Sequence, residues 1–213
     1  MSRGLALVFG TALLCGPAFA SSQSEPYGPL DEAMTICTTP SNNLDQRHTA
    51  LLEKGWRGEF DTEAFQHAYA DALLVANQPE QASAQLWSER RILTKMLAKG
   101  AGRDAITLTK SGTFAQLSTE DQNSFAVCLL GSLNDASAAK IFTRLLAADG
   151  AQEGDFGRVG EMYAIRQDAT GANWRTNIRL HELFEGKLDD ILEEPLVIDV
   201  VVILTTYPMG AEQ

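Results

Sequence analysis

The first hundred residues carry apolar side chains at the three- and four-residue spacing of an amphipathic α-helix. The pattern is clearest over residues 61–77, where one stripe is formed by Phe65, Ala68, Tyr69, Ala72, Leu73 and Ala76. Asp61 or Thr62 can cap the start of this helix. Weaker versions of the pattern predict further helices at 30–39, 44–54 and 79–99. We therefore expect about four helices in the N-terminal half.

Beyond residues 100–102 the chain shows alternating apolar and polar positions and short apolar runs, both typical of β-strands. Strands are predicted at 105–110, 113–117, 124–130, 158–167, 173–183 and 196–207. A helix-start signature at 118–121 predicts a short turn after the second strand. A further helix is predicted at 135–148, followed by a loop at 149–157.

The order of these elements indicates the fold class. Helices come first, and strands follow with one helix among them, which indicates an α+β fold. We expect about four N-terminal helices packed on a mostly antiparallel sheet with one inserted helix. Residues 168–171 favour a hairpin loop. The last strand is interrupted only by Asp199 and is therefore expected to be central and covered on both faces.

The N-terminus has the features of a secretory signal peptide at residues 1–20. Arg3 supplies the positive start, residues 5–14 are apolar, and residues 18–20 fit a small-x-small cleavage site. Two alternatives are an N-terminal core helix and a lipidated Cys15. A lipoprotein signal requires a small residue before the cysteine, and Leu14 stands there. Residues 21–29 are polar and predict a flexible lead-in.

The remaining chain, 30–213, is expected to form a single α+β domain with a helical half at 30–100 and a sheet half at 103–208. Cleavage of the leader removes Cys15 and leaves Cys37 and Cys128. In an exported chain two cysteines allow one intramolecular pairing, and we expect them to form a disulfide. The alternatives are two buried free thiols or a redox pair. Such a bond would tie the two halves together.

Composition narrows the range of partners. The chain has a formal net charge of −11, and without the leader it carries 16 basic and 28 acidic residues, a net charge of −12. This acidic balance argues against nucleic acid and anionic membranes as partners. The apolar runs are shorter than the roughly 20 residues that a membrane-spanning helix needs, so no such segment is expected in the mature chain.

The balance of residue types also suggests a source and a compartment. The chain contains 28 alanines, and 11 arginines outnumber 6 lysines, which suggests a bacterial, GC-rich origin. Together with the leader, this indicates a periplasmic or secreted protein.

Motifs that carry catalytic or metal chemistry are weak. His67 and Asp71 have a metal-ligand spacing but fall off the apolar stripe, so we interpret them as a solvated surface pair. His181, Glu182 and Glu185 lack the second histidine of a helical zinc site. We expect no metal and no cofactor. The sequence contains no Gly-x-Ser-x-Gly elbow, and adjacent acids such as Glu193 and Glu194 are usually solvated.

The glycines around Arg158 are a weak match to a phosphate-binding loop. Gly154, Gly157 and Gly160 are spaced three apart, but no strand clearly precedes them. A loop before a strand is the simpler interpretation.

The strongest candidate site lies on the predicted hairpin. Arg175, Asn177, Arg179 and His181 are two residues apart and therefore share one face of a strand. If that face is concave, Arg175, Arg179 and His181 would bind an anion or carboxylate. If it is open, they form a polar outer surface, which we favour.

No stretch of residues resembles the signature of a known family. We interpret the chain as an exported periplasmic protein, a non-catalytic module that binds a small molecule or a protein. Whether it is an enzyme stays open. The alternatives are an exported hydrolase whose site the sequence does not reveal, and an inhibitor or assembly partner that uses an exposed helix or sheet edge.

Overall fold

The computed structural model describes residues 28–58, 62–77, 84–100, 105–120, 124–133, 140, 143, 151–192 and 194–210. The predicted leader at 1–20 lies outside these residues, as does nearly all of the lead-in. Of the helix predicted at 135–148, only Lys140 and Thr143 are described, and both are helical.

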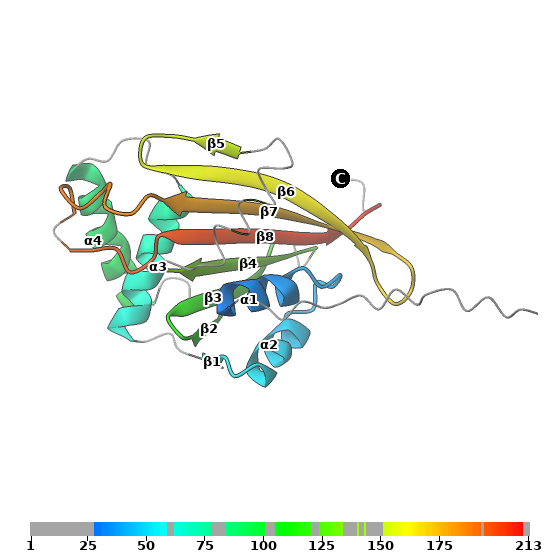
Figure 1. Ribbon diagram of the computed structural model, residues 1–213. Helices are drawn as coiled ribbons and strands as arrows, with labels where there is room; N and C mark the ends of the chain where they lie inside the picture. Colours follow the sequence, from blue (N-terminus) through cyan, green and yellow to red (C-terminus); the bar gives the residue numbers. More distant parts are fainter. Residues whose placement is uncertain are drawn as a thin grey trace, which may run out of the picture.

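Within the described residues, eight strands form one antiparallel sheet, and helices pack against both of its faces (Figure 1). The strands are β1 (Arg57–Gly58), β2 (Ile106–Lys110), β3 (Thr113–Glu120), β4 (Phe125–Ser132), β5 (Ala151–Glu153), β6 (Gly157–Gln167), β7 (Asn173–Leu183) and β8 (Val200–Pro208). They lie side by side in the order β1-β2-β3-β4-β8-β7-β6-β5. Besides the helical residues Lys140 and Thr143, the described helices are α1 (Pro29–Cys37), α2 (Leu44–Glu53), α3 (Glu63–Ala76) and α4 (Ala84–Ala98). The predicted α+β class is confirmed.

Some predicted strand boundaries are wrong. β3 continues through residues 118–120, where a turn was predicted, because these residues pair with β4. The local helix-start signature is therefore overridden by tertiary pairing. β8 begins at Val200 rather than at 196, and the predicted loop at 149–157 contains β5. Neither β1 nor β5 was predicted, because strands of two or three residues are too short to show alternation.

One face of the sheet is covered by α1 and α2. Even-numbered residues of β7 and β8, including Leu180 and Val202, point into this core together with Leu30 and Leu51 from the helices. Cys37 at the end of α1 is bonded to Cys128 on β4, with the two Cα atoms 6.2 Å apart. The predicted disulfide is confirmed, and it fixes α1 to the middle of the sheet.

A buried arginine on α2 lies beside this disulfide. Arg47 donates from Nη1 to Cys128 Sγ at 3.6 Å, and from Nη2 to the carbonyl oxygens of Thr39 and Ser41 at 3.1 and 2.7 Å. Burial lowers the pKa of Arg47 to about 10, so the side chain keeps its charge at neutral pH. Arg47 thereby holds the chain between α1 and α2 against the sheet.

The opposite face is covered by α3 at one end of the sheet. Thr62 caps this helix by accepting a hydrogen bond from the Phe65 amide. Phe65 packs edge-on against Phe114 of β3, with ring centroids 5.8 Å apart. The Phe114 ring occupies the space that a Cβ atom would take at Gly131, its partner across β3 and β4. Only glycine fits there, and the aromatic ring fills the gap.

A buried ion pair joins α3 to α4. Arg90 donates to both carboxylate oxygens of Asp71, at 2.5 and 3.1 Å. Its remaining donors reach the carbonyl oxygens of Glu194 and Pro195, and the Val197 amide donates to Asp71 at 2.7 Å. The interpretation of Asp71 as a solvated surface residue is wrong, because its side chain is fully buried. The Asp71–Arg90 pair therefore connects both helices to the segment before β8.

Removing the disulfide should weaken the fold without changing it. We expect the Cys37→Ala, Cys128→Ala double variant to lose about 2–5 kcal/mol of unfolding free energy, because the unfolded chain is no longer cross-linked. Urea denaturation of parent and variant measures the loss, and far-ultraviolet circular dichroism checks the fold. A variant as stable as the parent would contradict a structural role for the bond.

Breaking the Asp71–Arg90 pair should cost more than breaking an exposed pair. Asp71→Ala leaves a buried, charged Arg90 without its carboxylate, so we expect a loss of about 3–5 kcal/mol in unfolding free energy. Glu161→Ala, which removes an ion pair with Arg179 at the surface, should lose about 1 kcal/mol or less. Equal losses of unfolding free energy in the two variants, measured by urea denaturation, would contradict a larger contribution from the buried Asp71–Arg90 pair.

Candidate functional site

The β6–β7 hairpin carries the candidate site, and its loop is held by Asp168. Asp168 Oδ1 accepts from the amides of Thr170 and Ala172, and Oδ2 accepts from Trp174 Nε1 at 3.0 Å. Hydrogen bonds from the Thr170 and Trp174 side chains, followed by those from the backbone, lower the pKa of Asp168 to about 2. Gly171 has φ +85°, which favours glycine. The predicted hairpin is confirmed, and its register is set at the loop.

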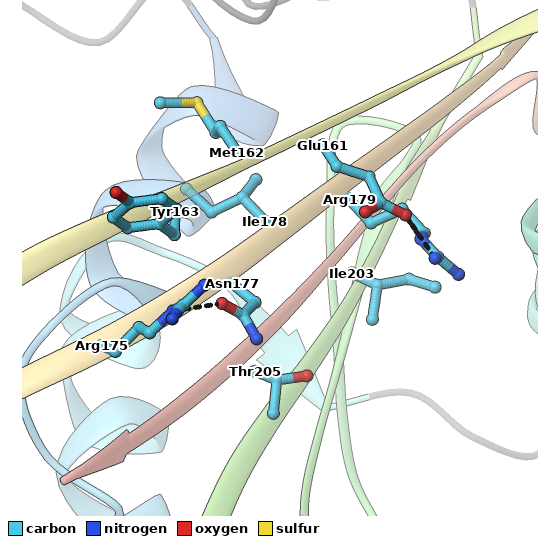
Figure 2. Close-up of a pocket in the computed structure, with 9 residues that line it drawn as sticks. All are labelled: Glu161, Met162, Tyr163, Arg175, Asn177, Ile178, Arg179, Ile203 and Thr205. Carbon is cyan, nitrogen blue, oxygen red and sulfur yellow. Dashed lines mark hydrogen bonds and ion pairs between the residues drawn. The ribbon is translucent and has the colours of Figure 1, made fainter. Parts of the chain in front are cut away.

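This register places the four candidate residues on one face, as alternation predicted. Arg175, Asn177, Arg179 and His181 pair with Tyr207, Thr205, Ile203 and Val201 of β8. They lie on the same face of the sheet as α3, and the first three line a hollow of about 410 Å³ (Figure 2). The hollow is lined by Glu161, Met162, Tyr163, Arg175, Asn177, Ile178, Arg179, Ile203 and Thr205. The face is therefore neither fully open nor a deep cleft.

The two arginines of the hollow differ in their partners. Arg179 forms an ion pair with Glu161 of β6, and both side chains are about half exposed. Arg175 instead lies over the ring of Tyr163, with Cζ 4.4 Å from the ring centroid. Its Nε donates to Asn177 Oδ1 at 2.9 Å. Among the described residues no carboxylate pairs with Arg175, so its terminal nitrogens remain available to an anion.

Asn177 orients the Arg175 side chain and is itself held from β8. Its Nδ2 donates to Tyr207 Oη at 3.4 Å. Figure 2 shows Arg175 and Asn177 next to each other, with Thr205 from β8 beside them. The stacked ring of Tyr163 and the amide of Asn177 both restrain the guanidinium, so less conformational entropy is lost when a ligand binds.

His181 does not line the hollow, although the sequence grouped it with the two arginines. Its side chain is only 3% exposed, and within the described part of the chain neither ring nitrogen has a hydrogen-bond partner. Burial, together with the nearby charge of Arg179, lowers the pKa of His181 to about 4, against a smaller opposing effect of Glu161. His181 is therefore neutral at neutral pH.

The remaining candidates have structural explanations. His67 Nε2 lies 3.9 Å from Glu63 Oε1. Asp71, the residue that was paired with His67 as a possible metal ligand, is bound by Arg90 instead. Glu182 pairs with Arg158. The Gly154 amide donates to the Gly157 carbonyl at 2.9 Å, which closes the β5–β6 hairpin.

The described residues contain no metal-binding cluster, and they form a second hollow beside α4. Over these ranges no group of three or more His, Cys, Asp and Glu side chains lies close enough to hold a metal ion. A second, smaller hollow of about 190 Å³ lies beside α4, and its lining includes Arg91, Thr94 and Lys95.

Sequence reasoning missed the residues contributed by β6 and β8. Glu161 and Tyr163 were identifiable in principle, because the hairpin loop sets which β6 residues face Arg179 and Asn177. Thr205 and Ile203 were not, because no short loop connects β7 to β8 and the register between them is set by tertiary packing.

Comparisons with known proteins do not indicate a function for this chain. No protein family matches the chain, and neither the curated proteins nor the solved structures include a detectable match. In the described part of the chain, no helix combines the length and the apolar character needed to cross a membrane.

His181 should make the fold sensitive to acid. Its pKa in the folded protein is about 4, below the ordinary 6.5, so the unfolded chain binds the proton more tightly. The stability that neutral His181 contributes is complete above pH 6.5 and is lost as the pH falls toward 4. Urea denaturation across this pH range should show that the free energy of unfolding falls by up to about 3 kcal/mol.

A variant pair isolates this contribution. His181→Leu should remove this part of the pH dependence, whereas His67→Gln should retain it. If the parent and His181→Leu lose stability in parallel between pH 6.5 and pH 4, His181 is not the responsible group.

Proposed function

We propose that this protein is an exported binding module of the periplasm or extracellular space that binds a small carboxylate at the hollow of the β6–β7–β8 face. The observation that carries the proposal is Arg175: a restrained guanidinium with no carboxylate partner among the described residues, set in a concave surface. No covalent chemistry is needed for this role.

The chemistry of the lining supports a carboxylate ligand with an apolar body. Arginine presents two parallel N–H groups that match the two oxygens of a carboxylate. Thr205, which lies opposite Asn177 on β8, adds a hydroxyl group to the lining, and Ile203 supplies apolar surface. The aromatic edge of Tyr163 borders the same space. An anion with a small hydrophobic group would therefore contact both parts of the lining.

The size and openness of the hollow set the expected affinity. A volume of about 410 Å³ lies within the range of small-molecule sites, roughly 300–1,000 Å³. However, the hollow is open on the solvent side, since Glu161 and Arg179 at one end are half exposed. We expect modest affinity, because a ligand would keep part of its surface in water.

Two observations support the export part of the proposal. The sequence begins with a pattern typical of a secretory signal. The Cys37–Cys128 disulfide is of a kind that persists in oxidising compartments. We therefore propose Ser21 as the first residue of the mature protein.

The ligand test uses charge-removing variants of two arginines on the same hairpin. Parent protein, Arg175→Gln and Arg166→Gln are purified after export, and intact mass identifies the first residue.

Melting temperatures are then measured with a panel of aliphatic and aromatic carboxylates and inorganic phosphate. A ligand that binds only the folded state raises its stability by about 2.7 kcal/mol at 100 times its dissociation constant.

We expect a carboxylate to stabilise the parent and Arg166→Gln equally, and Arg175→Gln much less. Arg166 is the matched control because it lies on the same hairpin but, by alternation along β6, on the other face of the sheet. A shift that survives in Arg175→Gln, or the absence of any shift across the panel, would overturn the proposed site.

A further inference from the structure

One edge of the sheet is only partly covered. β6 runs over eleven residues, but β5 pairs with only Arg158, Val159 and Gly160 at its start (Figure 1). Over the ranges that the structure describes, no strand pairs with the outer edge of β6 from Glu161 to Gln167. Unpaired edges of this length are uncommon, because they present free backbone groups to other chains.

The hairpin registers reveal which backbone groups are free. The Asp168 amide donates to the Ala172 carbonyl, so even-numbered residues of β6 bond to β7. The Gly154 amide donates to the Gly157 carbonyl, so odd-numbered residues face β5. Beyond β5, the residues that direct both their N–H and C=O groups outward are therefore Glu161, Tyr163, Ile165 and Gln167.

The side chains along this edge are also unusual for a solvent-facing strand. Tyr163 and Ile165 are 57% and 51% exposed, and they are neighbours on one face. Natural edge strands are commonly protected by lysine, proline or a bulge. From Glu161 to Gln167 the charged residues are Arg166 and Glu161, and Glu161 already pairs with Arg179. There is no lysine and no proline, and the register with β7 is continuous, without a bulge.

We infer that the free edge of β6 binds the same edge of a second copy of this chain, in antiparallel register about a two-fold axis at Ala164. This contact does not depend on a ligand in the hollow. Glu161 then pairs with Gln167 of the second copy, and Tyr163 pairs with Ile165. The two eight-stranded sheets become continuous.

Four features favour this occupant and this register. All four outward-facing residues of each copy are used, whereas a two-fold axis one residue away, at Tyr163 or Ile165, uses three of them. No like charges stand opposite each other, because Arg166 faces Met162 of the second copy. Aromatic and β-branched residues meet across the strands, which is a favourable pair. At the axis the strands approach most closely, and Ala164 has a small side chain.

The interface is short, so the dimer should be in equilibrium with the monomer. Sedimentation velocity from micromolar to millimolar concentrations, at physiological ionic strength, should show the average mass rising from monomer toward dimer. Ile165→Lys removes the β-branched partner of Tyr163 of the second copy and introduces the lysine with which natural edge strands are commonly protected, so this variant should remain monomeric. Ile92→Lys is the matched control, since Ile92 is 54% exposed and lies on α4, a helix that packs against α3 and is not part of the sheet edge.

A cysteine pair tests the register. In the proposed dimer Ala164 faces its own copy as a non-hydrogen-bonded pair, with Cα atoms about 4.5 Å apart, within the range a disulfide can bridge. Under oxidation Ala164→Cys should therefore give a covalent dimer. Met162→Cys should not, because the two positions would be roughly 13 Å apart, four residues along the strand.

The outcomes are distinct. Concentration-dependent dimerisation that Ile165→Lys abolishes and Ile92→Lys retains, with cross-linking at 164 and not at 162, supports the inference. A parent that remains monomeric at every concentration overturns it, as does an Ile165→Lys variant that associates as the parent does. Circular dichroism confirms that each variant is folded, and the mass measurement on Ile165→Lys stands if a cysteine variant fails to fold.

Discussion

The pairing of β8 between β4 and β7 is the constraint on which the rest of the structure depends. β8 is last among the strands in chain order, yet it lies in the interior of the sheet. Val200, Val202 and Leu204 complete the core under α1 and α2, while Val201 and Ile203 pack on the opposite face. Neither core nor candidate site is complete without it. Neither of the strands that pair with β8 is joined to it by a short loop. Forming these contacts therefore requires long loops to close, and the entropy lost in closing them opposes folding.

Two links secure this non-local arrangement by different physical means. The disulfide restricts the unfolded chain and needs no particular dielectric environment. The Asp71–Arg90 pair acts in the folded state, where burial makes any missing partner costly. The first link fixes α1 to β4 on one face, and the second fixes α3 and α4 to the segment that leads into β8 on the other. Both faces are thus held to the middle of the sheet.

The sequence predicted what depends on local spacing and missed what depends on distant partners. The helices, the β6–β7 hairpin and the shared face of Arg175 and Arg179 follow from periodicity and loop residues. The disulfide follows from the small number of cysteines. The burial of Asp71 does not, since its partner Arg90 and the amide of Val197 lie 19 and 126 residues away. Likewise, Arg179 has a carboxylate partner in Glu161, across the hairpin, whereas Arg175 has none among the described residues.

The contact between Phe114 and Gly131 limits how this sheet can change over time. The ring fills the space above the glycine and is held against Phe65, so a methyl group at 131 requires a smaller side chain at 114. A smaller residue at 114 alone leaves a void beneath α3, which is itself destabilising. The residue at each position therefore makes most single substitutions at the other position destabilising. Related sequences should therefore vary at these two positions together or not at all, and their covariation would identify the β3–β4 register without a structure.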